Sequence, residues 1–381
     1  MPFFSPMKPS PSSFIQSTFL LLAVQAVVFV SNLGLSSCVH AQSAEPDDLD
    51  FSSMIQPVPS TAILRSPEYD IWGCSPVKGD DGKYHLFYSR WPHSLGHHAW
   101  VTHSEIAHAV STSPFGPWKH SDVALSSRGN AFWDGSCTHN PTVLEIDGKF
   151  YLYYMGNRGD QEVRKPLNWD HRNRQRVGVA VADSPYGPWK RFDRPVVDVS
   201  TDEQAVDALC VSNPAVARRP GGGVLMIYKT VAKQFPLPSG GPVGLGIATA
   251  DDPAGPFKKH NVQPFSVPGE RFAAEDPYIW RGKDRYWAIV KDRNGHFTGL
   301  KGFSLALFQS HDGFDWSQAK HLLVTAPGFT WEHGQREDLV IMERPQLLLE
   351  DGIPTALYCA AAKTRDKANG FNVQIPLKLS E

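Results

Sequence analysis

The chain has 381 residues, with 37 Lys and Arg against 39 Asp and Glu, which gives a formal net charge of −2 at pH 7. A charge balance this close to neutral excludes a general electrostatic attraction to nucleic acid or to an anionic membrane surface. The length is ample for one large hydrophobic core.

The N-terminus has the pattern of an export signal. Lys8 precedes an apolar stretch from Phe19 to Leu35, and Val39-His40-Ala41 has the spacing of a signal-peptidase site. We therefore expect residues 1–41 to be a signal peptide and the mature protein to be secreted or periplasmic. Polar residues interrupt the apolar run, so no membrane span is expected after processing. Leu35-Ser36-Ser37-Cys38 also resembles a loose lipoprotein box, which is the alternative.

Residues 42–59 follow the predicted cleavage site. This segment is acidic and contains Pro and Ser, so we expect a linker or an edge segment. The folded domain is then expected to occupy residues 60–381.

Five copies of one sequence module fill that domain. Each copy begins near a proline, and successive prolines are 63 to 73 residues apart, at Pro76, Pro141, Pro214, Pro277 and Pro345. Two apolar runs joined by a Gly- or Asp-centred turn follow each proline. In the first four copies a third run ends at a near-repeated turn, written SPFGPWK, SPYGPWK, DPAGPFK and DGFDWSQ. The repetition indicates one supersecondary unit used five times.

The runs within each module are typical of β-strands. They alternate aromatic and β-branched residues over six to eight positions and are bounded by Gly, Pro, Asp and Asn. Five such units predict an all-β, five-bladed β-propeller. A β-sandwich is the alternative, but it would not require the same turn four times. The aromatic residues of these turns are expected to pack between blades; they are Trp118, Trp189, Phe257 and Trp316.

Four cysteines remain after the predicted cleavage. Cys74, Cys137 and Cys210 each precede a module proline by two to four residues, so they are expected near the axis on consecutive blades. Export permits disulfides, so either one neighbouring pair is bridged or all four are buried thiols. No Cys/His spacing points to a metal, and no cofactor is expected.

Acidic residues cluster where the modules begin. Asp70 opens the first module, Glu275 and Asp276 open the fourth, and Glu343 opens the fifth. The innermost strands of a propeller begin near one mouth of its central channel, so these carboxylates are expected to converge on a shared pocket. Converging carboxylates are what glycosidic cleavage requires, because one protonates the leaving oxygen and another activates water or attacks the sugar.

Polar residues end the second runs of four modules. These residues are Arg90, Asn157, Lys229 and Lys291, which fall 14 to 16 residues after their prolines. Their equivalent placement predicts a ring of cations and amides suited to hydroxyls, carboxylates or sulfates. Solvated strand ends are the alternative. The full set of expected substrate-binding residues is Arg90, Glu105, Asp134, His139, Asn140, Asn157, Lys229, Glu275 and Lys291.

Histidines concentrate in the first module, at His93, His97, His98, His103 and His108. No face spacing typical of a metal site occurs among them, so substrate hydrogen bonding from a long loop is the favoured interpretation. His333, in the last connection between modules, is a candidate general acid if its pKa is tuned.

At these residues the chain resembles the five-bladed propeller glycoside hydrolases. The similarity is best to family 117 over the last two modules, from Glu275-Asp276-Pro277 to Glu343-Arg344-Pro345, and weaker to families 43 and 32. The resemblance implies Asp70 as general base and Asp276 as the residue that modulates the pKa of the acid. The third module has Ser212-Asn213-Pro214 where family 43 has a catalytic Glu-Gly-Pro, so Glu343 and His333 compete for the role of acid.

The sequence therefore predicts an exported, exo-acting and inverting glycoside hydrolase. Its expected substrate is a plant-wall or algal oligosaccharide or polysaccharide, possibly anionic. We expect Glu343 to be the acid, with a pKa raised by neighbouring carboxylates. A secreted carbohydrate-binding propeller without catalysis is the alternative, and it is favoured if Asp70, Asp276 and one of Glu343 or His333 do not meet around one sugar ring.

Overall fold

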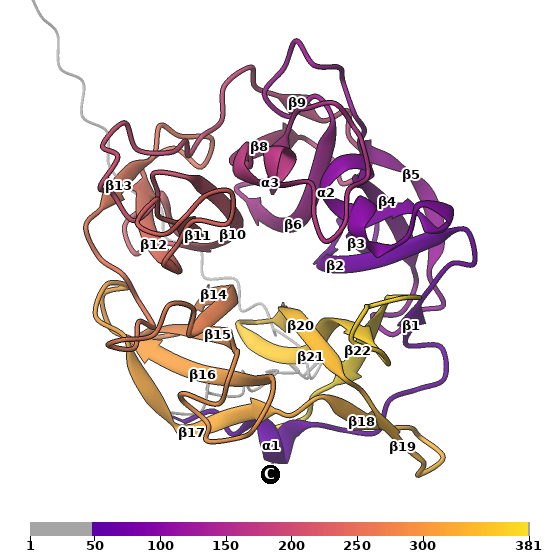
Figure 1. Ribbon diagram of the computed structural model, residues 1–381. Coiled ribbons are helices and arrows are strands. Elements are labelled where there is room, and N and C mark those ends of the chain that lie inside the picture. The colour runs from indigo at the N-terminus through magenta and orange to yellow at the C-terminus, as the bar shows by residue number, and fades with distance from the viewer. Residues whose placement is uncertain (1–47, 380–381) are drawn as a thin grey trace, which may run out of the picture. The chain divides into compact units, whose positions relative to one another are not determined.

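Five four-stranded antiparallel sheets surround a central axis in the computed structural model, which describes residues 48–379 (Figure 1). Each sheet is one blade, and the first four blades follow the chain from the innermost strand outward. The structure confirms the predicted five-bladed β-propeller, and a sandwich of two packed sheets is excluded.

The strands of each blade run in chain order. Blade one contains β2 (Tyr69–Lys78), β3 (Tyr84–Pro92), β4 (Glu105–Ser111) and β5 (Lys119–Leu125). Blade two contains β6 (Cys137–Ile146), β7 (Lys149–Asn157), β8 (Arg176–Ala182) and β9 (Lys190–Arg191). Blade three contains β10 (Cys210–Arg218), β11 (Val224–Val231), β12 (Val243–Ala250) and β13 (Lys258–His260). Blade four contains β14 (Ala274–Arg281), β15 (Tyr286–Asp292), β16 (Ser304–Ser310) and β17 (Ser317–Thr325).

Blade five closes the propeller with strands from both ends of the domain. It contains β20 (Ile341–Glu350), β21 (Ile353–Ala362), β22 (Phe371–Pro376) and, outermost, β1 (Ile63–Leu64) from the N-terminal side. Ile63 pairs with Val373 in antiparallel register. This pairing ties the first blade to the last and leaves blade five with four strands like the others. A separate hairpin, β18 (Gly328–Thr330) and β19 (Arg336–Asp338), connects blades four and five.

Of the two expectations for residues 42–59, a linker or an edge segment, the described residues 48–59 do not fit a free linker. A short helix, α1 (Phe51–Met54), is anchored by apolar side chains that join the core of blades four and five. Phe51 is fully buried and meets the ring of Trp280 edge-on at 6.4 Å. Because acidic residues dominate the composition of this segment, the composition did not predict a buried helix. In the structure Phe51 and Met54 lie close together and are both buried. The predicted signal peptide and lipoprotein box lie outside the described residues.

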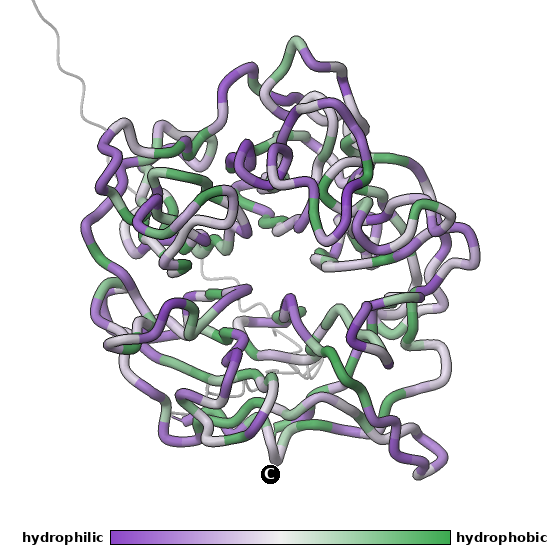
Figure 2. Tube along the Cα trace, in the orientation of Figure 1, coloured by the Kyte–Doolittle hydropathy of each residue, from purple (hydrophilic) through white to green (hydrophobic). Residues whose placement is uncertain are grey.

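The aromatic residues of the closing turns pack between blades, as predicted. Trp189 of blade two meets Phe87 of blade one edge-on at 5.2 Å. Phe257 of blade three meets Tyr153 of blade two at 6.4 Å. The indole of Trp118 donates to Gln374 Oε1 in blade five at 3.1 Å. Figure 2 shows the resulting pattern, with hydrophobic residues along the strands and hydrophilic ones along many of the loops.

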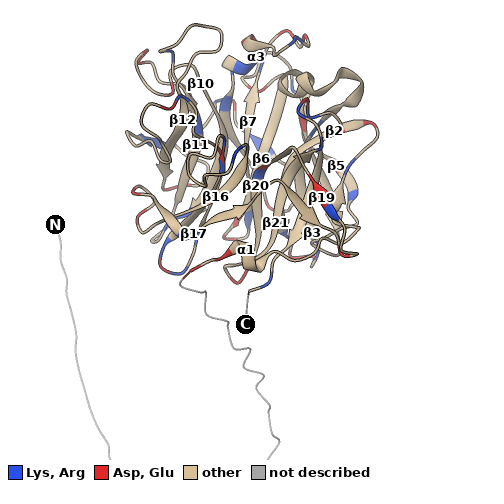
Figure 3. Cartoon of the chain, turned by 60° about the horizontal axis from the view of Figure 1, so that its bottom comes forward, with Lys and Arg blue, Asp and Glu red and all other residues tan. Residues whose placement is uncertain are grey.

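The four described cysteines are free and buried, at Cys74, Cys137, Cys210 and Cys359, so the thiol alternative holds among residues 48–379. No helix in this part of the chain is long and apolar enough to cross a membrane. Positive and negative residues are intermixed over the loops and strand ends (Figure 3). Three short helical segments precede β4, namely η1 (His93–Leu95), η2 (His97–Ala99) and α2 (Trp100–His103), and α3 (Trp169–Asn173) precedes β8.

Candidate active site

The five innermost strands share one irregularity, which builds the site. In each of β2, β6, β10, β14 and β20 the register with the second strand shifts at the same level. At that level each strand has a residue with positive φ: Gly73, Asn140, Asn213, Asp276 and Arg344. Asn and Asp tolerate this left-handed conformation better than most residues, and glycine adopts it without steric cost. The bulge interrupts the ladder and re-aims the neighbouring side chains.

The side chains at these bulges form a hydrogen-bonded arc around the axis. Asn140 Nδ2 donates to Asn213 Oδ1 at 2.8 Å, and Asn213 Nδ2 donates to Asp276 Oδ1 at 2.8 Å. Arg344 Nη1 lies 3.5 Å from the same Asp276 oxygen. Gly73 has no side chain at the remaining position. A Cβ there would lie 2.9 Å from Asn140 Oδ1 and 3.5 Å from Arg344 Nε, so the long Arg344 side chain occupies the space beside the glycine.

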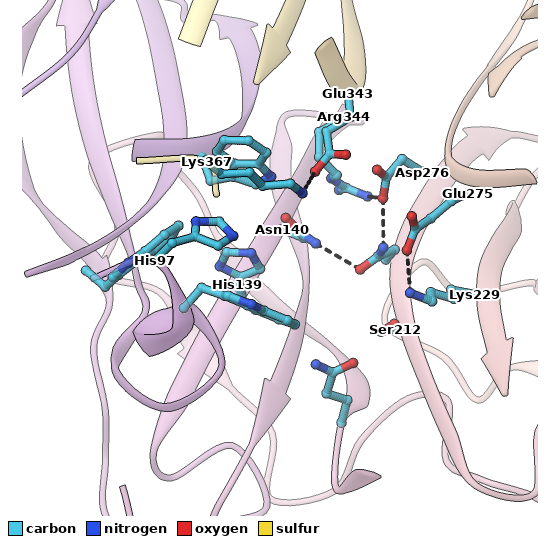
Figure 4. Close-up of a pocket in the computed structure, with 15 residues that line it drawn as sticks. His97, His139, Asn140, Ser212, Lys229, Glu275, Asp276, Glu343, Arg344 and Lys367 are labelled. Atoms are coloured by element: carbon cyan, nitrogen blue, oxygen red, sulfur yellow. Dashed lines mark hydrogen bonds and ion pairs between the residues drawn. The ribbon is translucent and has the colours of Figure 1, made fainter. Parts of the chain in front are cut away.

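The residues immediately before the bulges point into a cavity of about 130 Å³. Two of its walls differ in character (Figure 4). Blades one and two supply aromatic rings, whereas blades three to five supply charged and polar groups. The aromatic wall consists of Trp72, Trp91, His97, Trp100 and His139, and the polar wall of Ser212, Lys229, Glu275, Asp276, Glu343, Arg344 and Lys367. Asn140, Asn213 and Gln175 complete the lining.

Lys291 lies behind the polar wall and forms ion pairs with all three of its carboxylates. Its Nζ lies 2.6 Å from Glu275 Oε2, 2.8 Å from Glu343 Oε2 and 3.1 Å from Asp276 Oδ2. The residue is only 3% exposed. Burial alone would lower the pKa of this ammonium, but the three carboxylates raise it above its usual value. Lys291 is therefore charged, and it fixes three acidic side chains around one point.

Further cations hold two of these carboxylates in their ionised form. Lys367 Nζ contacts Glu343 Oε1 at 2.6 Å, and Lys229 Nζ contacts Glu275 Oε1. Burial would raise the pKa of Glu343, but Lys291 and Lys367 lower it to about 2. Burial likewise opposes ionisation of Glu275, whose pKa Lys229 and Lys291 hold well below its usual value. The expectation that carboxylate neighbours raise the pKa of Glu343 is therefore wrong, because its lysine partners outweigh them.

The histidines of the aromatic wall are neutral near pH 7. Burial lowers the pKa of His97 to about 4, with a further contribution from Lys367. Burial also places the pKa of His139 well below its usual value, and Arg344 adds to the effect. The ring of His139 lies between Trp91 and Trp100, with ring centroids at 5.7 and 5.1 Å.

Four polar atoms of the lining are buried without a hydrogen-bond partner. They are His97 Nδ1, Asn140 Oδ1, Gln175 Nε2 and Arg344 Nε. Buried polar groups are normally satisfied, so a group of unsatisfied ones in one cavity indicates a place for a polar ligand or for water. Their mixture of donors and acceptors suits hydroxyl groups, which can both donate and accept.

The structure brings most of the expected residues to this site. Asp276, Glu343, Glu275, Lys229, His139 and Asn140 line the cavity, and Lys291 lies directly behind it. The repeated module is the reason, because the first strand of each blade delivers equivalent positions to the axis.

Asp70 is not among the residues that line the cavity, which corrects its expected position. It is 1% exposed, and its Oδ1 lies 3.0 Å from His93 Nδ1 in η1. Its Oδ2 is buried without a hydrogen-bond partner. The expectation follows from the place of Asp70 at the start of the first module and from the family resemblance. In the structure Gly73 is the equivalent of Asn140 and Asp276, so Asp70 falls three residues before the bulge.

His333 also lies away from the axis. It occupies the turn between β18 and β19, is exposed, stacks on Trp331 at 6.2 Å and lies 3.4 Å from Gln335 Oε1. Figure 1 shows this hairpin projecting from the outer edge of the propeller. The path of this connection could not be predicted from the sequence. Because His333 lies in an exposed turn away from the axis, it is not a candidate for the general acid of this cavity.

The remaining expected ligands belong to other structural contacts. Arg90 Nε donates to Glu105 Oε1 at 2.9 Å, and Arg90 lines a separate groove of about 260 Å³ beside blade five. Asp134 is buried with Arg128 Nε at 2.6 Å and Tyr154 Oη at 2.7 Å. Asn157 Oδ1 meets His171 Nδ1 at 2.8 Å. Of the predicted ring of polar residues at strand ends, only Lys229 and Lys291 therefore lie at the axis.

Several lining residues were not expected from the sequence: Trp72, Trp91, Trp100, Gln175, Ser212, Asn213, Arg344 and Lys367. A usable signal exists for Trp72, Ser212 and Arg344, because each stands at or just before a bulge position. The loop residues carry no such signal. No group of three or more His, Cys, Asp or Glu side chains within residues 48–379 could hold a metal ion.

Comparison with known proteins identifies the architecture. No protein-family model and no curated protein matches the chain. Among solved structures, a family 117 glycoside hydrolase from the marine bacterium Zobellia galactanivorans has 19% sequence identity, covering 86% of this chain and 90% of that chain, with a TM-score of 0.58. A structure described as a glycoside hydrolase has 15% identity, covering 87% and 94%, with a TM-score of 0.64.

An α-L-arabinanase of Cellvibrio cellulosa in complex with arabinohexaose has 18% identity, covering 82% of this chain and 93% of that chain, with a TM-score of 0.52. These similarities establish a shared five-bladed fold, in agreement with the resemblance found in the sequence. The similarities cover 82–87% of this chain and 90–94% of the three solved chains.

Proposed function

We propose that this protein is a glycoside hydrolase that acts on the terminal sugar of an oligosaccharide held in the axial cavity. One observation carries the proposal. An aromatic wall on one side of a small cavity faces three carboxylates on the other side, Glu275, Asp276 and Glu343. The fold similarity to glycoside hydrolases supports the same class. A pocket walled by all five blades favours an exo-acting enzyme, because it accepts one chain end more readily than an internal stretch.

The two walls suit the two characters of a sugar ring. The flat apolar face of a sugar packs on aromatic rings, which Trp72, Trp91 and Trp100 offer. The hydroxyl groups then meet the unpartnered atoms of Asn140, Gln175 and Arg344. Sugar binding therefore satisfies polar atoms that are otherwise buried without partners.

Glu343, which the sequence favours as the acid, is the candidate base or nucleophile instead, and the leaving oxygen takes its proton from solvent water because no protonated donor is assigned. The pKa of about 2 keeps the Glu343 carboxylate ionised near neutral pH. An ionised carboxylate is what activation of water or attack on the sugar requires. The family resemblance implies that Asp276 modulates the pKa of the acid, and Lys291 joins it to Glu343. Asp70, tied to His93, is not assigned a role in this scheme.

Release assays with plant-wall and red-algal oligosaccharides test the proposal. We expect one terminal sugar to accumulate, and proton NMR of the first product is expected to show inverted configuration. Retention would identify Glu343 as a nucleophile instead of a base. Binding of an oligosaccharide without release of any sugar would contradict the proposed hydrolase.

A non-catalytic carbohydrate-binding propeller is the second candidate, and a specific observation favours it. Glu343, Glu275, His97 and His139 all have lowered pKa values, so none of them is held as a protonated donor in the free protein. The same release assay separates the two candidates, since only the hydrolase changes the covalent structure of its ligand.

Export through the N-terminal signal is part of the proposal. Cleavage after Ala41 would give a mature chain beginning at Gln42. N-terminal sequencing of protein recovered from the periplasm or the medium tests it, and intact Met1 on all of the recovered protein would contradict it.

A further inference from the structure

The ion pairs around the cavity contain more positive than negative charge. Each cation of the group lies within 3.9 Å of at least one of its carboxylates. We refer to the group as the axial charge cluster. Its cations are Lys229, Lys291, Arg293, Arg344 and Lys367, and its carboxylates are Glu275, Asp276 and Glu343.

The lining itself is balanced, with Lys229, Arg344 and Lys367 against three carboxylates, and the surplus comes from Lys291 and Arg293 behind it. Glu275, Asp276 and Glu343 are the only carboxylates among the described residues that line the cavity. Asp366, next to Lys367, is exposed and bonds to Thr364 Oγ1 and the Ala368 N–H instead. The side chains of Lys367 and Arg293 are 25% and 31% exposed, so water screens part of the surplus, and an anion in the cavity would offset the rest.

The surplus is concentrated at Glu275. This one carboxylate has three cations around it: Lys229, Lys291 and Arg293. Lys229 lines the cavity and has three N–H groups, of which Glu275 takes one. Arg293 lies behind the lining, with its guanidinium 3.9 Å from the centre of the Phe272 ring. Lys229 is therefore the cation of this group that a ligand can reach.

Hydrogen-bond donors adjoin Lys229 on the same side of the cavity. Ser212 pairs with Lys229 in the register of β10 and β11. The backbone of Gln175 meets the neighbouring Val211, whose N–H lies 3.4 Å from the Gln175 carbonyl oxygen. Gln175 is 4% exposed, lines the cavity and has a buried Nε2 without a hydrogen-bond partner. An ammonium, a hydroxyl and an unpartnered amide nitrogen together form a subsite rich in donors.

The floor of the cavity has a different character. Arg344 Nε is an unpartnered donor and Asn140 Oδ1 is an unpartnered acceptor, and both lie within 3.5 Å of the point where a Gly73 Cβ would be. A hydroxyl group satisfies both atoms, whereas an anion would be repelled by the amide oxygen. The Lys229 side is therefore the better position for negative charge.

From this asymmetry we propose that the sugar bound in the axial cavity carries an anionic substituent, a carboxylate or a sulfate, which binds Lys229, Ser212 and Gln175. The inference rests on the proposed function and narrows its substrate to acidic sugars. A carboxylate or sulfate oxygen accepts from all three groups and compensates the surplus charge of the axial charge cluster.

Titration calorimetry with matched sugars tests the inference. The pairs are D-galacturonate and D-galactose, D-glucuronate and D-glucose, and galactose 6-sulfate and galactose. We expect the acidic member of at least one pair to bind more than tenfold more tightly, and added salt to weaken that preference. The uronate and sulfate arms distinguish the two sources of negative charge. Equal or tighter binding of the neutral member in every pair overturns the inference, as does the absence of binding by every acidic sugar.

Variants locate the subsite. Gln175→Glu puts a negative charge beside the proposed anion and should abolish the preference for the acidic sugar, and Lys229→Met should reduce it at least tenfold. Lys149→Met is the matched control, because Lys149 is exposed and pairs with the exposed Asp183 at 3.6 Å. Persistence of the preference in both subsite variants overturns the assignment. Circular dichroism checks that each variant is folded.

The outcome separates this inference from the proposed function. Hydrolysis of neutral oligosaccharides at rates equal to those of acidic ones would leave a hydrolase and remove the anionic subsite. Preferential binding of acidic sugars without cleavage of any acidic oligosaccharide would keep the subsite and remove the hydrolase.

Discussion

Gly73 is the one position of the axial arc without a side chain, and the cavity depends on that absence. Gly73→Ala would place a Cβ 2.9 Å from Asn140 Oδ1 and 3.5 Å from Arg344 Nε, at a φ of +33°. We expect sugar binding to weaken about tenfold, which corresponds to roughly 1.4 kcal/mol, because the methyl group displaces Asn140 and Arg344, whose unpartnered atoms line the cavity. Calorimetry with the best-binding sugar measures the effect.

Gly82→Ala is the control for backbone strain alone. Gly82 also has positive φ, but a Cβ there would meet no atom within 4 Å. If both variants bind the sugar equally well, the space beside Gly73 is not part of the binding site.

Lys291 is the residue on which the three carboxylates converge, so its removal should be costly. Lys291→Met leaves the buried Glu275, Asp276 and Glu343 without their shared partner. Removing one member of a buried ion pair typically costs about 3–5 kcal/mol. We expect urea unfolding at pH 7 to show a loss of this order, which becomes smaller at pH 4 because loss of Lys291 raises the pKa of Glu275 and Glu343 in the variant. Unchanged stability at pH 7 would show that Lys291 does not compensate these charges.

Glu343 predicts a pH dependence of stability with a definite sign. Its pKa is about 2 in the folded protein, below the ordinary value of 4.5 that applies when the chain is unfolded. A group with a lowered pKa stabilises the folded state fully above the unfolded pKa and loses that contribution as pH falls through the folded one. We therefore expect the unfolding free energies of wild type and Glu343→Gln to differ most above pH 5 and to converge towards pH 2. A difference that grows as pH falls would contradict the assignment.

At the scale of elements, the segment around α1 is a structural part of blades four and five. Phe51→Ala removes a fully buried ring that contacts Trp280, and such truncations cost about 3–5 kcal/mol. We expect a lower midpoint of thermal unfolding. Leu237→Ala is the control, because Leu237 is an exposed apolar residue. If the two variants unfold at the same temperature, the segment is only a linker, as its composition suggested.

The strands themselves could be predicted because each carries a local period-two pattern and a repeated closing turn. The bulges could not be aligned across all blades, since Gly73 lacks the proline that directly follows Asn140, Asn213, Asp276 and Arg344. The expected base, Asp70, follows from the family resemblance and not from this register, in which Gly73 is the equivalent residue. The position of His333 depends on the β18–β19 hairpin, which belongs to no module and has no counterpart among residues 48–379.

At the scale of the whole propeller, the repeat predicts where a site forms but not its chemistry. Five equivalent strands must meet at the axis, so Asp276 and Glu343 could be brought together from spacing alone. The lowered pKa of Glu343 depends on Lys367, which lies in the loop between β21 and β22 and is far from Lys291 in sequence. Tertiary charge pairing of this kind leaves no local pattern in the sequence.

The strand that carries Glu343 also carries a carboxylate outside the axial cavity, Glu350. Glu350 lies on the same strand as Glu343, at the opposite end, and pairs with Lys78 at 3.7 Å in partly exposed surroundings. It therefore provides a carboxylate on the same element that should have no part in catalysis.

The initial rate of terminal-sugar release, compared among wild type, Glu343→Gln and Glu350→Gln, tests most directly that the axial cavity is a hydrolytic site. Loss of a group acting in general acid–base catalysis costs about 10²- to 10⁴-fold in rate. We predict a loss in this range for Glu343→Gln and a rate within about twofold of wild type for Glu350→Gln. Equal rates of release by wild type and a folded Glu343→Gln variant would contradict the assignment of catalysis to this cavity.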